Sequence, residues 1–358
     1  MTKIVGPGSD QSKKYAALSA DGITLAVTSE LGGTLNLYSR NGNNWSLQGG
    51  PFSVTANYEA AAISADGNTV LVSSQIFNRS GSTWTKTTTL SCPNIESFTS
   101  ALSADGKTAV IDSSTGFCVF TKLGPNWIFT ASYSGVPGST FILSRGLGVA
   151  ISADGSTIAL GIPMDGGCAG AYSCVMGFGS VSIFTRMGAS WVQQGSKLVG
   201  SDAVGAAGQG MSIALSADGN TLVEEGPCDG NSQATGGGCR TAAWVFVRTG
   251  STWTQQGPKL IGTQDQTTDS GWDVLNINAT VSADGNTLAF GAPTNGAGTS
   301  WIFTRTNNIW TQKSQLSLNT ADATRDPGYF GVGMSLSATG NSLFNGFSGI
   351  DIGYIYGQ

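Results

Sequence analysis

Hydrophobic and polar positions along this chain repeat in short units that share one turn phrase. The phrase reads Ser-Ala-Asp-Gly-x-Thr and is followed by apolar residues. An Asp-Gly pair between two runs of strand-forming residues predicts a tight β-hairpin. The six intact copies occupy residues 19–24, 64–69, 103–108, 152–157, 216–221 and 282–287, and a worn copy occupies 337–340. Hairpins that recur at roughly 40–65 residues predict a repeat architecture.

One unit, residues 211–260, shows the predicted elements. Residues 212–215 alternate small and large side chains, and apolar residues return at 221–223 after the Asp-Gly turn. A Gly-rich loop follows, then an apolar run at 243–248, a turn, and a fourth run that opens at Trp253. Four antiparallel strands of this kind make one blade of a β-propeller.

A cation and a tryptophan flank the turn before the fourth strand. Phe184-Thr185-Arg186, for example, precedes Trp191 by a few residues. The two side chains can meet across the short turn, so we expect the cation to stack on the indole as a structural contact.

The last unit stops after its third strand, and the N-terminus offers the missing one. Thr2-Lys3-Ile4-Val5-Gly6 resembles Ser196-Lys197-Leu198-Val199-Gly200, which follows the fourth strand of another unit. Residues 1–358 are therefore predicted to form one all-β domain, a seven-bladed propeller with four antiparallel strands per blade. The N-terminal strand completes the last blade and closes the ring.

Two further motifs resemble the FG-GAP repeat of integrin-α-type propellers: Phe330-Gly331-Val332-Gly333 and Leu288 to Pro293. The resemblance implies a propeller that supports adhesion and protein–protein contact. Calcium loops of that family carry several acids, whereas each hairpin here offers one, so no metal site is expected. We expect these acids to form turns: Asp21, Asp66, Asp105, Asp154, Asp218 and Asp284.

Composition excludes several classes of function. Only 11% of residues are charged, the net charge is −5, and the chain contains no histidine. Nucleic acids and anionic membranes need clustered basic residues, and none are present. No apolar run reaches the roughly 18–20 residues of a membrane span. The missing histidine removes the commonest general base and any Ser-His-Asp triad, and no cofactor motif is apparent.

Six cysteines have spacings that suit disulfides better than zinc: Cys92, Cys118, Cys168, Cys174, Cys228 and Cys239. We expect pairs between Cys168 and Cys174 and between Cys228 and Cys239, because each pair shares one loop. Disulfides are typical of an oxidising setting such as the cell exterior or a virion surface. Residues 1–14 show no apolar secretion signal, so we expect either a trimmed signal or another route of export.

Long insertions gather on one predicted face of the ring, where the second strand leads to the third and one blade leads to the next. Binding residues concentrate on such loops. The candidate ligand-binding residues are Arg145, Arg240, Arg325, Trp272, Asp265, Asp269 and Asp273. A second acidic group, Glu224, Glu225 and Asp229, is expected to consist of solvated loop acids.

Three functions remain open at this point. The leading interpretation is a non-enzymatic adhesion or assembly module that contacts a protein partner or further copies of itself. The second is a lectin that binds glycans on the same loop face. The third is a sialidase-like hydrolase that would hold a carboxylate with the three arginines. Its only adjacent Tyr and Glu, Tyr58 and Glu59, would point to opposite sides of a strand.

Overall fold

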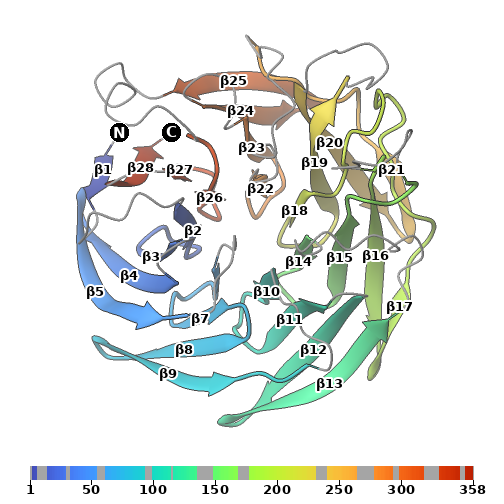
Figure 1. Cartoon of the computed structure of the whole chain (residues 1–358). Helices are drawn as coiled ribbons and strands as arrows, with labels where there is room; N and C mark the ends of the chain where they lie inside the picture. The colour runs from blue at the N-terminus through green and yellow to red at the C-terminus, as the bar shows by residue number, and fades with distance from the viewer. Residues whose placement is uncertain are drawn as a thin grey trace.

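Seven four-stranded antiparallel sheets stand around a central axis in the computed structural model of the chain (Figure 1). The fold is a seven-bladed β-propeller, as the repeats predict. The structure describes residues 2–5, 14–29, 33–54, 61–92, 99–113, 116–134, 148–167, 177–230, 240–263, 278–292, 298–317, 330–346 and 351–357. Within these ranges, no helix has the length and hydropathy of a membrane span.

Each blade runs from an inner first strand to an outer fourth strand. Blade 1 contains β2 (Lys14–Leu18), β3 (Thr24–Ser29), β4 (Thr34–Asn41) and β5 (Asn44–Ser53). Blade 2 contains β6 (Ala62–Ile63), β7 (Thr69–Val72), β8 (Gln75–Ser80) and β9 (Thr83–Thr89). Blade 3 contains β10 (Ser100–Leu102), β11 (Thr108–Ser113), β12 (Gly116–Leu123) and β13 (Asn126–Ser134). Blade 4 contains β14 (Val149–Ile151), β15 (Thr157–Ile162), β16 (Ser180–Met187) and β17 (Ser190–Gln193).

The remaining three blades follow the same order, except that the last borrows a strand. Blade 5 contains β18 (Ser212–Leu215), β19 (Thr221–Asp229), β20 (Arg240–Thr249) and β21 (Thr252–Gln255). Blade 6 contains β22 (Thr280–Val281), β23 (Thr287–Ala292), β24 (Thr299–Thr306) and β25 (Ile309–Ser317). Blade 7 contains β26 (Met334–Leu336), β27 (Ser342–Gly346), β28 (Asp351–Gly357) and β1 (Thr2–Val5).

Strand β1 closes the ring as predicted. It pairs antiparallel with β28, with Thr2 opposite Ile355 and Ile4 opposite Gly353. Ile4 is buried among residues of blades 1 and 7. The two chain ends therefore lie beside each other in Figure 1.

The alanine of the turn phrase forms a closed ring of backbone hydrogen bonds. Each of these alanines donates its N–H to the carbonyl oxygen of the corresponding alanine in the next blade, at 2.8–3.2 Å. The ring comprises Ala20, Ala65, Ala104, Ala153, Ala217, Ala283 and Ala338. The N–H of Ala338 returns to Ala20 at 3.0 Å, so the phrase joins the blades as well as turning each hairpin.

The other letters of the phrase have local roles, illustrated by blade 5. Ser216 Oγ donates to Asp218 Oδ1 at 2.6 Å and accepts the backbone N–H of Thr221 at 2.9 Å. Asp218 also accepts the N–H of Asn220 at 2.9 Å. Gly219 has φ +65°, and a Cβ there would meet Ser152 of blade 4 at 3.0 Å. The same pair of serine hydrogen bonds recurs in all six intact turns.

The core lies in layers between adjacent blades. Trp244 and Trp301, both fully buried, belong to the layers between blades 4 and 5 and between blades 5 and 6. The second strands are buried on both faces, whereas side chains of the fourth strands are mostly exposed. The rigid inner strands thus present two faces of turns and loops, on which binding groups can be held.

Candidate functional site between blades 2 and 3

A side-chain bridge joins neighbouring blades on the face formed by the Ser-Ala-Asp-Gly turns, here called the turn face. Arg248 of blade 5 donates through Nη1 to Thr157 Oγ1 at 3.1 Å and to Gln194 Oε1 at 3.5 Å, both in blade 4. Trp253 Nε1 donates to the same Gln194 oxygen at 3.0 Å. The Arg248 guanidinium also stacks on the Trp253 ring, 5.4 Å from its centroid.

The same bridge recurs between blades 5 and 6. Arg305 Nη1 and Trp310 Nε1 both donate to Gln256 Oε1 at 3.0 Å, and Arg305 Nη2 approaches Thr221 Oγ1 at 3.5 Å. In both grooves the glutamine lies three residues after the tryptophan of the preceding blade. One amide oxygen thus accepts hydrogen bonds from a cation and an indole at once.

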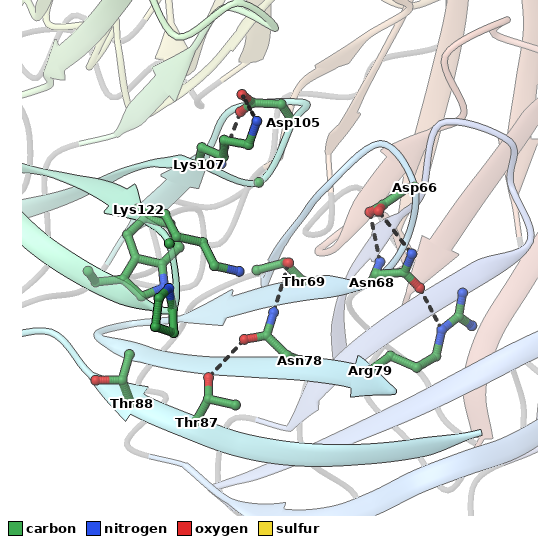
Figure 2. A pocket seen from close by; sticks show the side chains of 14 residues that line it. Asp66, Asn68, Thr69, Asn78, Arg79, Thr87, Thr88, Asp105, Lys107 and Lys122 are labelled. Carbon is green, nitrogen blue, oxygen red and sulfur yellow. Dashed lines mark hydrogen bonds and ion pairs between the residues drawn. The ribbon is translucent and has the colours of Figure 1, made fainter. Parts of the chain in front are cut away.

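Between blades 2 and 3, the two side chains at the positions of the arginine and the glutamine are shorter. A pocket of about 660 Å³ lies there instead of the bridge. Lys122 replaces the arginine and Thr87 replaces the glutamine, while Trp127 and Thr69 keep their positions. Figure 2 shows the Lys122 side chain extending from blade 3 towards Thr69 of blade 2. Across the described residues, neither the Lys122 ammonium nor the Trp127 indole N–H has a hydrogen-bond partner.

The blade 2 wall of the pocket is held together by its own hydrogen bonds (Figure 2). Asn78 Nδ2 donates to Thr69 Oγ1 at 2.9 Å, and Thr87 Oγ1 donates to Asn78 Oδ1 at 2.8 Å. Arg79 Nε donates to Asn68 Oδ1 at 2.8 Å. The wall is therefore a preformed row of amide and hydroxyl groups.

Three cationic and two anionic side chains line the pocket. Burial pushes the pKa of Asp66 up, but hydrogen bonds from Ser64 and Asn68 and the charge of Arg79 outweigh it. The pKa lies below its ordinary value, and the group is a carboxylate at neutral pH. Asp105 faces Lys107 at 3.8 Å in an exposed ion pair. Of the three lining cations, Lys122 is the one without a carboxylate or hydrogen-bond partner among the described residues.

Most of the ligand-binding residues predicted for the loop face lie outside the described residues: Arg145, Arg325, Trp272, Asp265, Asp269 and Asp273. Tyr58 and Glu59 also lie outside them. Arg240 is described, and it begins β20 with an exposed side chain opposite Asp229.

The prediction that Glu224, Glu225 and Asp229 are solvated loop acids is wrong. Strand β19 runs on to Asp229, beyond the predicted end at Val223, and all three acids are buried. Asp229 forms an ion pair with Lys259 Nζ at 2.5 Å and accepts the N–H of Val204 at 2.7 Å. The chain looks loop-like here because an acid pair is followed by Gly and Pro, but packing between blades outweighs these local signals.

Glu224 and Glu225 face opposite neighbours. Glu224 lies opposite Ile213 and Trp244, on the side that packs against blade 4. Burial raises the pKa of Glu224 well above its ordinary value. Burial also raises the pKa of Glu225, and the backbone N–H of Gly291 in blade 6 offsets part of this effect. Among the described acids and cysteines, no group of three or more is placed to share a metal ion.

A disulfide joins Cys92, which precedes blade 3, to Cys118 of β12. Cys228 is also disulfide-bonded. Cys168, Cys174 and Cys239 lie outside the described residues, so the two pairings predicted within loops remain predictions. The observed disulfide is typical of an oxidising environment.

No protein-family model and no curated protein matches the chain. Hydrazine synthase of Kuenenia stuttgartiensis is structurally similar, with a TM-score of 0.59 and 14% identity over 100% of this chain and 97% of that chain. The Cps50 (Swd1) β-propeller domain of Myceliophteria thermophila is similar with a TM-score of 0.62 and 10% identity over the full length of both chains. At these identities the likeness shows the fold alone, and the FG-GAP resemblance remains a prediction.

The pocket between blades 2 and 3 was not predicted from the sequence. The available signal was the position three residues after each tryptophan: Gln194 and Gln256 in two blades, Thr87 in blade 2. The glutamine could be recognised as a bridge only once the structure placed it between a cation and an indole of the next blade.

Proposed function

We propose that this chain is a non-enzymatic interaction module, which serves adhesion or assembly through the faces of its propeller. The observation that carries the proposal is that three loop-face acids within the described ranges are already held by neighbouring side chains. Asp165 pairs with Lys197 at 2.7 Å, and Asp229 pairs with Lys259. Asp202 accepts hydrogen bonds from side chains of blade 5. Hydrolysis by paired carboxylates needs acids that are free to exchange protons with a substrate.

The proposed setting is extracellular or on the surface of a cell or virion. The Cys92–Cys118 disulfide supports it, because such bonds persist in oxidising compartments. The low charge of the chain agrees with a protein or self-assembly partner better than with nucleic acid. On the loop face, Arg240 is exposed and available to a partner, and Arg145, Arg325, Trp272, Asp265, Asp269 and Asp273 are proposed to extend that surface.

Lysine-directed cross-linking with mass spectrometry tests this proposal on the native particles or cells that carry the chain. Lys86 and Lys107 are exposed reporters on the outer edge and the turn face. We expect cross-links to a second protein or to another copy. The purified chain, cross-linked at the same concentration, is the control for self-association. Cross-links confined to single copies in both samples would contradict the proposal.

Carbohydrate binding is the second candidate function. The pocket between blades 2 and 3 favours it, because amide, hydroxyl and indole groups converge there in an open hollow. Sites of about 300–1,000 Å³ with a few fixed polar groups are typical of small-molecule binding. This pocket lies on the turn face, whereas the sequence placed a lectin site on the loop face.

A further inference from the structure

We propose that the pocket between blades 2 and 3 binds an acidic saccharide, whose carboxylate accepts hydrogen bonds from Lys122 Nζ and Trp127 Nε1. This inference rests on the carbohydrate-binding role proposed above and specifies the ligand of that site. The two bridged grooves of the same molecule indicate which ligand group the pocket can bind.

The bridged grooves show what the pocket lacks. Gln194 Oε1 accepts from Arg248 and Trp253, and Gln256 Oε1 accepts from Arg305 and Trp310. Both amide oxygens occupy the point where a cation and an indole N–H converge. In the pocket, Thr87 is too short to place an oxygen there and instead donates to Asn78 at 2.8 Å.

A ligand oxygen at this point would complete the same pattern. The Lys122 ammonium and the Trp127 N–H are the two donors that the bridge would otherwise use. An ammonium group binds a carboxylate through charge-assisted hydrogen bonds, which are shorter and stronger than those to a neutral oxygen. The ligand atom that replaces the glutamine oxygen is therefore assigned as a carboxylate oxygen.

The rest of the pocket favours a saccharide over an acidic peptide. Asn68, Asn78, Thr87 and Thr88 present amides and hydroxyls that suit a polyhydroxylated ring, and Trp127 offers an aromatic wall. Peptide and protein anchors are enriched in Trp, Tyr and Arg side chains that fill well-packed, desolvated pockets. Apart from glycines, only Trp127 and Pro125 are non-polar among the lining residues.

The groove between blades 3 and 4 provides the matched control. It also has threonine in place of glutamine, Thr130, whose hydroxyl donates to Val119 O at 3.1 Å. There Arg186 donates through Nε to the carbonyl of Gly188 at 3.1 Å, so its cation already has an acceptor. Thr130→Gln therefore changes an equivalent position without touching the proposed site.

The test uses the full chain and three variants. Lys122→Met removes the charge, and the double variant Thr87→Gln/Lys122→Arg rebuilds the bridge and fills the pocket. An array of sialylated, uronic-acid-containing and neutral glycans selects ligands, and calorimetry then compares 3′-sialyllactose or a glucuronide with lactose. We expect at least one acidic saccharide to bind, with an affinity loss of about ten-fold or more in Lys122→Met. Binding should vanish in the double variant and persist in Thr130→Gln.

Other outcomes separate this inference from the proposals beneath it. A neutral glycan that binds and is lost in the double variant would overturn the acidic ligand but keep the carbohydrate-binding role. A hexaglutamate peptide that binds in the same manner, with no glycan bound, would overturn the saccharide and leave the interaction module standing. The absence of any acidic glycan bound, or acidic glycan binding unchanged in the double variant, would also overturn the inference. Thermal unfolding of each variant shows that a lost signal comes from the pocket and not from misfolding.

Discussion

Glu224 is a carboxylic acid at a position that carries hydrocarbon side chains in neighbouring blades. Leu160 of β15 and Phe290 of β23 occupy the corresponding places. Neither carboxyl oxygen of Glu224 has a hydrogen-bond partner among the described residues, and its side chain is fully buried. We therefore predict that Glu224→Leu stabilises the propeller at neutral pH.

The size of this stabilisation follows from the free-energy cost of keeping the buried Glu224 carboxyl protonated. In the unfolded chain the carboxyl ionises near its ordinary pKa of 4.5, whereas burial raises the pKa in the folded chain well above this value. Keeping the carboxyl protonated costs about 1.4 kcal/mol for each pH unit above the unfolded pKa, up to the folded pKa. Leucine has a similar volume and forms no unpaired polar group, so the change should recover about this amount.

The pH dependence has a definite sign. Between pH 4.5 and the folded pKa, the folded state binds more protons at Glu224 than the unfolded state does. The free energy of unfolding must then fall as the pH rises, by up to about 1.4 kcal/mol per pH unit for this group. Glu224→Leu should reduce that slope, and Glu224→Gln should also reduce it while leaving a buried polar group.

Urea-induced unfolding from pH 5 to pH 8, followed by tryptophan fluorescence, measures both effects. The gap in unfolding free energy between the parent and each variant should be widest at pH 8 and narrow towards pH 5. If Glu224→Leu is less stable than the parent at pH 7, or keeps the same pH slope, then the buried acid is not the cause and the reasoning fails.

Three other predictions concern the scaffold. Removing residues 1–5 takes β1 from blade 7 together with the buried Ile4, so the thermal midpoint should fall sharply; an unchanged midpoint would contradict ring closure by this strand. Ser216→Ala should cost about 1–3 kcal/mol of unfolding free energy in a urea titration, because the buried N–H of Thr221 loses its acceptor. Asp218→Asn keeps an oxygen acceptor and should cost less in the same assay. Cys118→Ala should cost about 3 kcal/mol by opening a link across 26 residues, and a variant as stable as the oxidised parent would show that the disulfide contributes nothing.

The sequence predicted the features that depend on local chemistry and repetition. The Asp218-Gly219 pair is enough to predict a hairpin, because the conformations that these two residues favour suit the turn. The resemblance of the segment around Ile4 to the segment around Leu198 predicted how the ring closes, since both follow a fourth strand. These signals lie within a few residues of one another or recur in every unit.

Features that depend on neighbouring blades were harder to predict. The alanine of the turn phrase joins the next blade through its backbone, and no property of its side chain reveals this contact. Glu224 and Glu225 look like solvent-exposed acids until the flanking blades are placed around them. The pocket at Lys122 arises from a missing contact between two blades, so its size could not be read from either blade alone.

We propose that the chain works by contact with a partner. Cryo-electron microscopy of the native material that carries the chain, at near-atomic resolution, would show such a contact. We predict rings whose turn face or loop face is seated against another protein, another copy, or a glycan. Isolated rings with no additional density on either face would contradict the account.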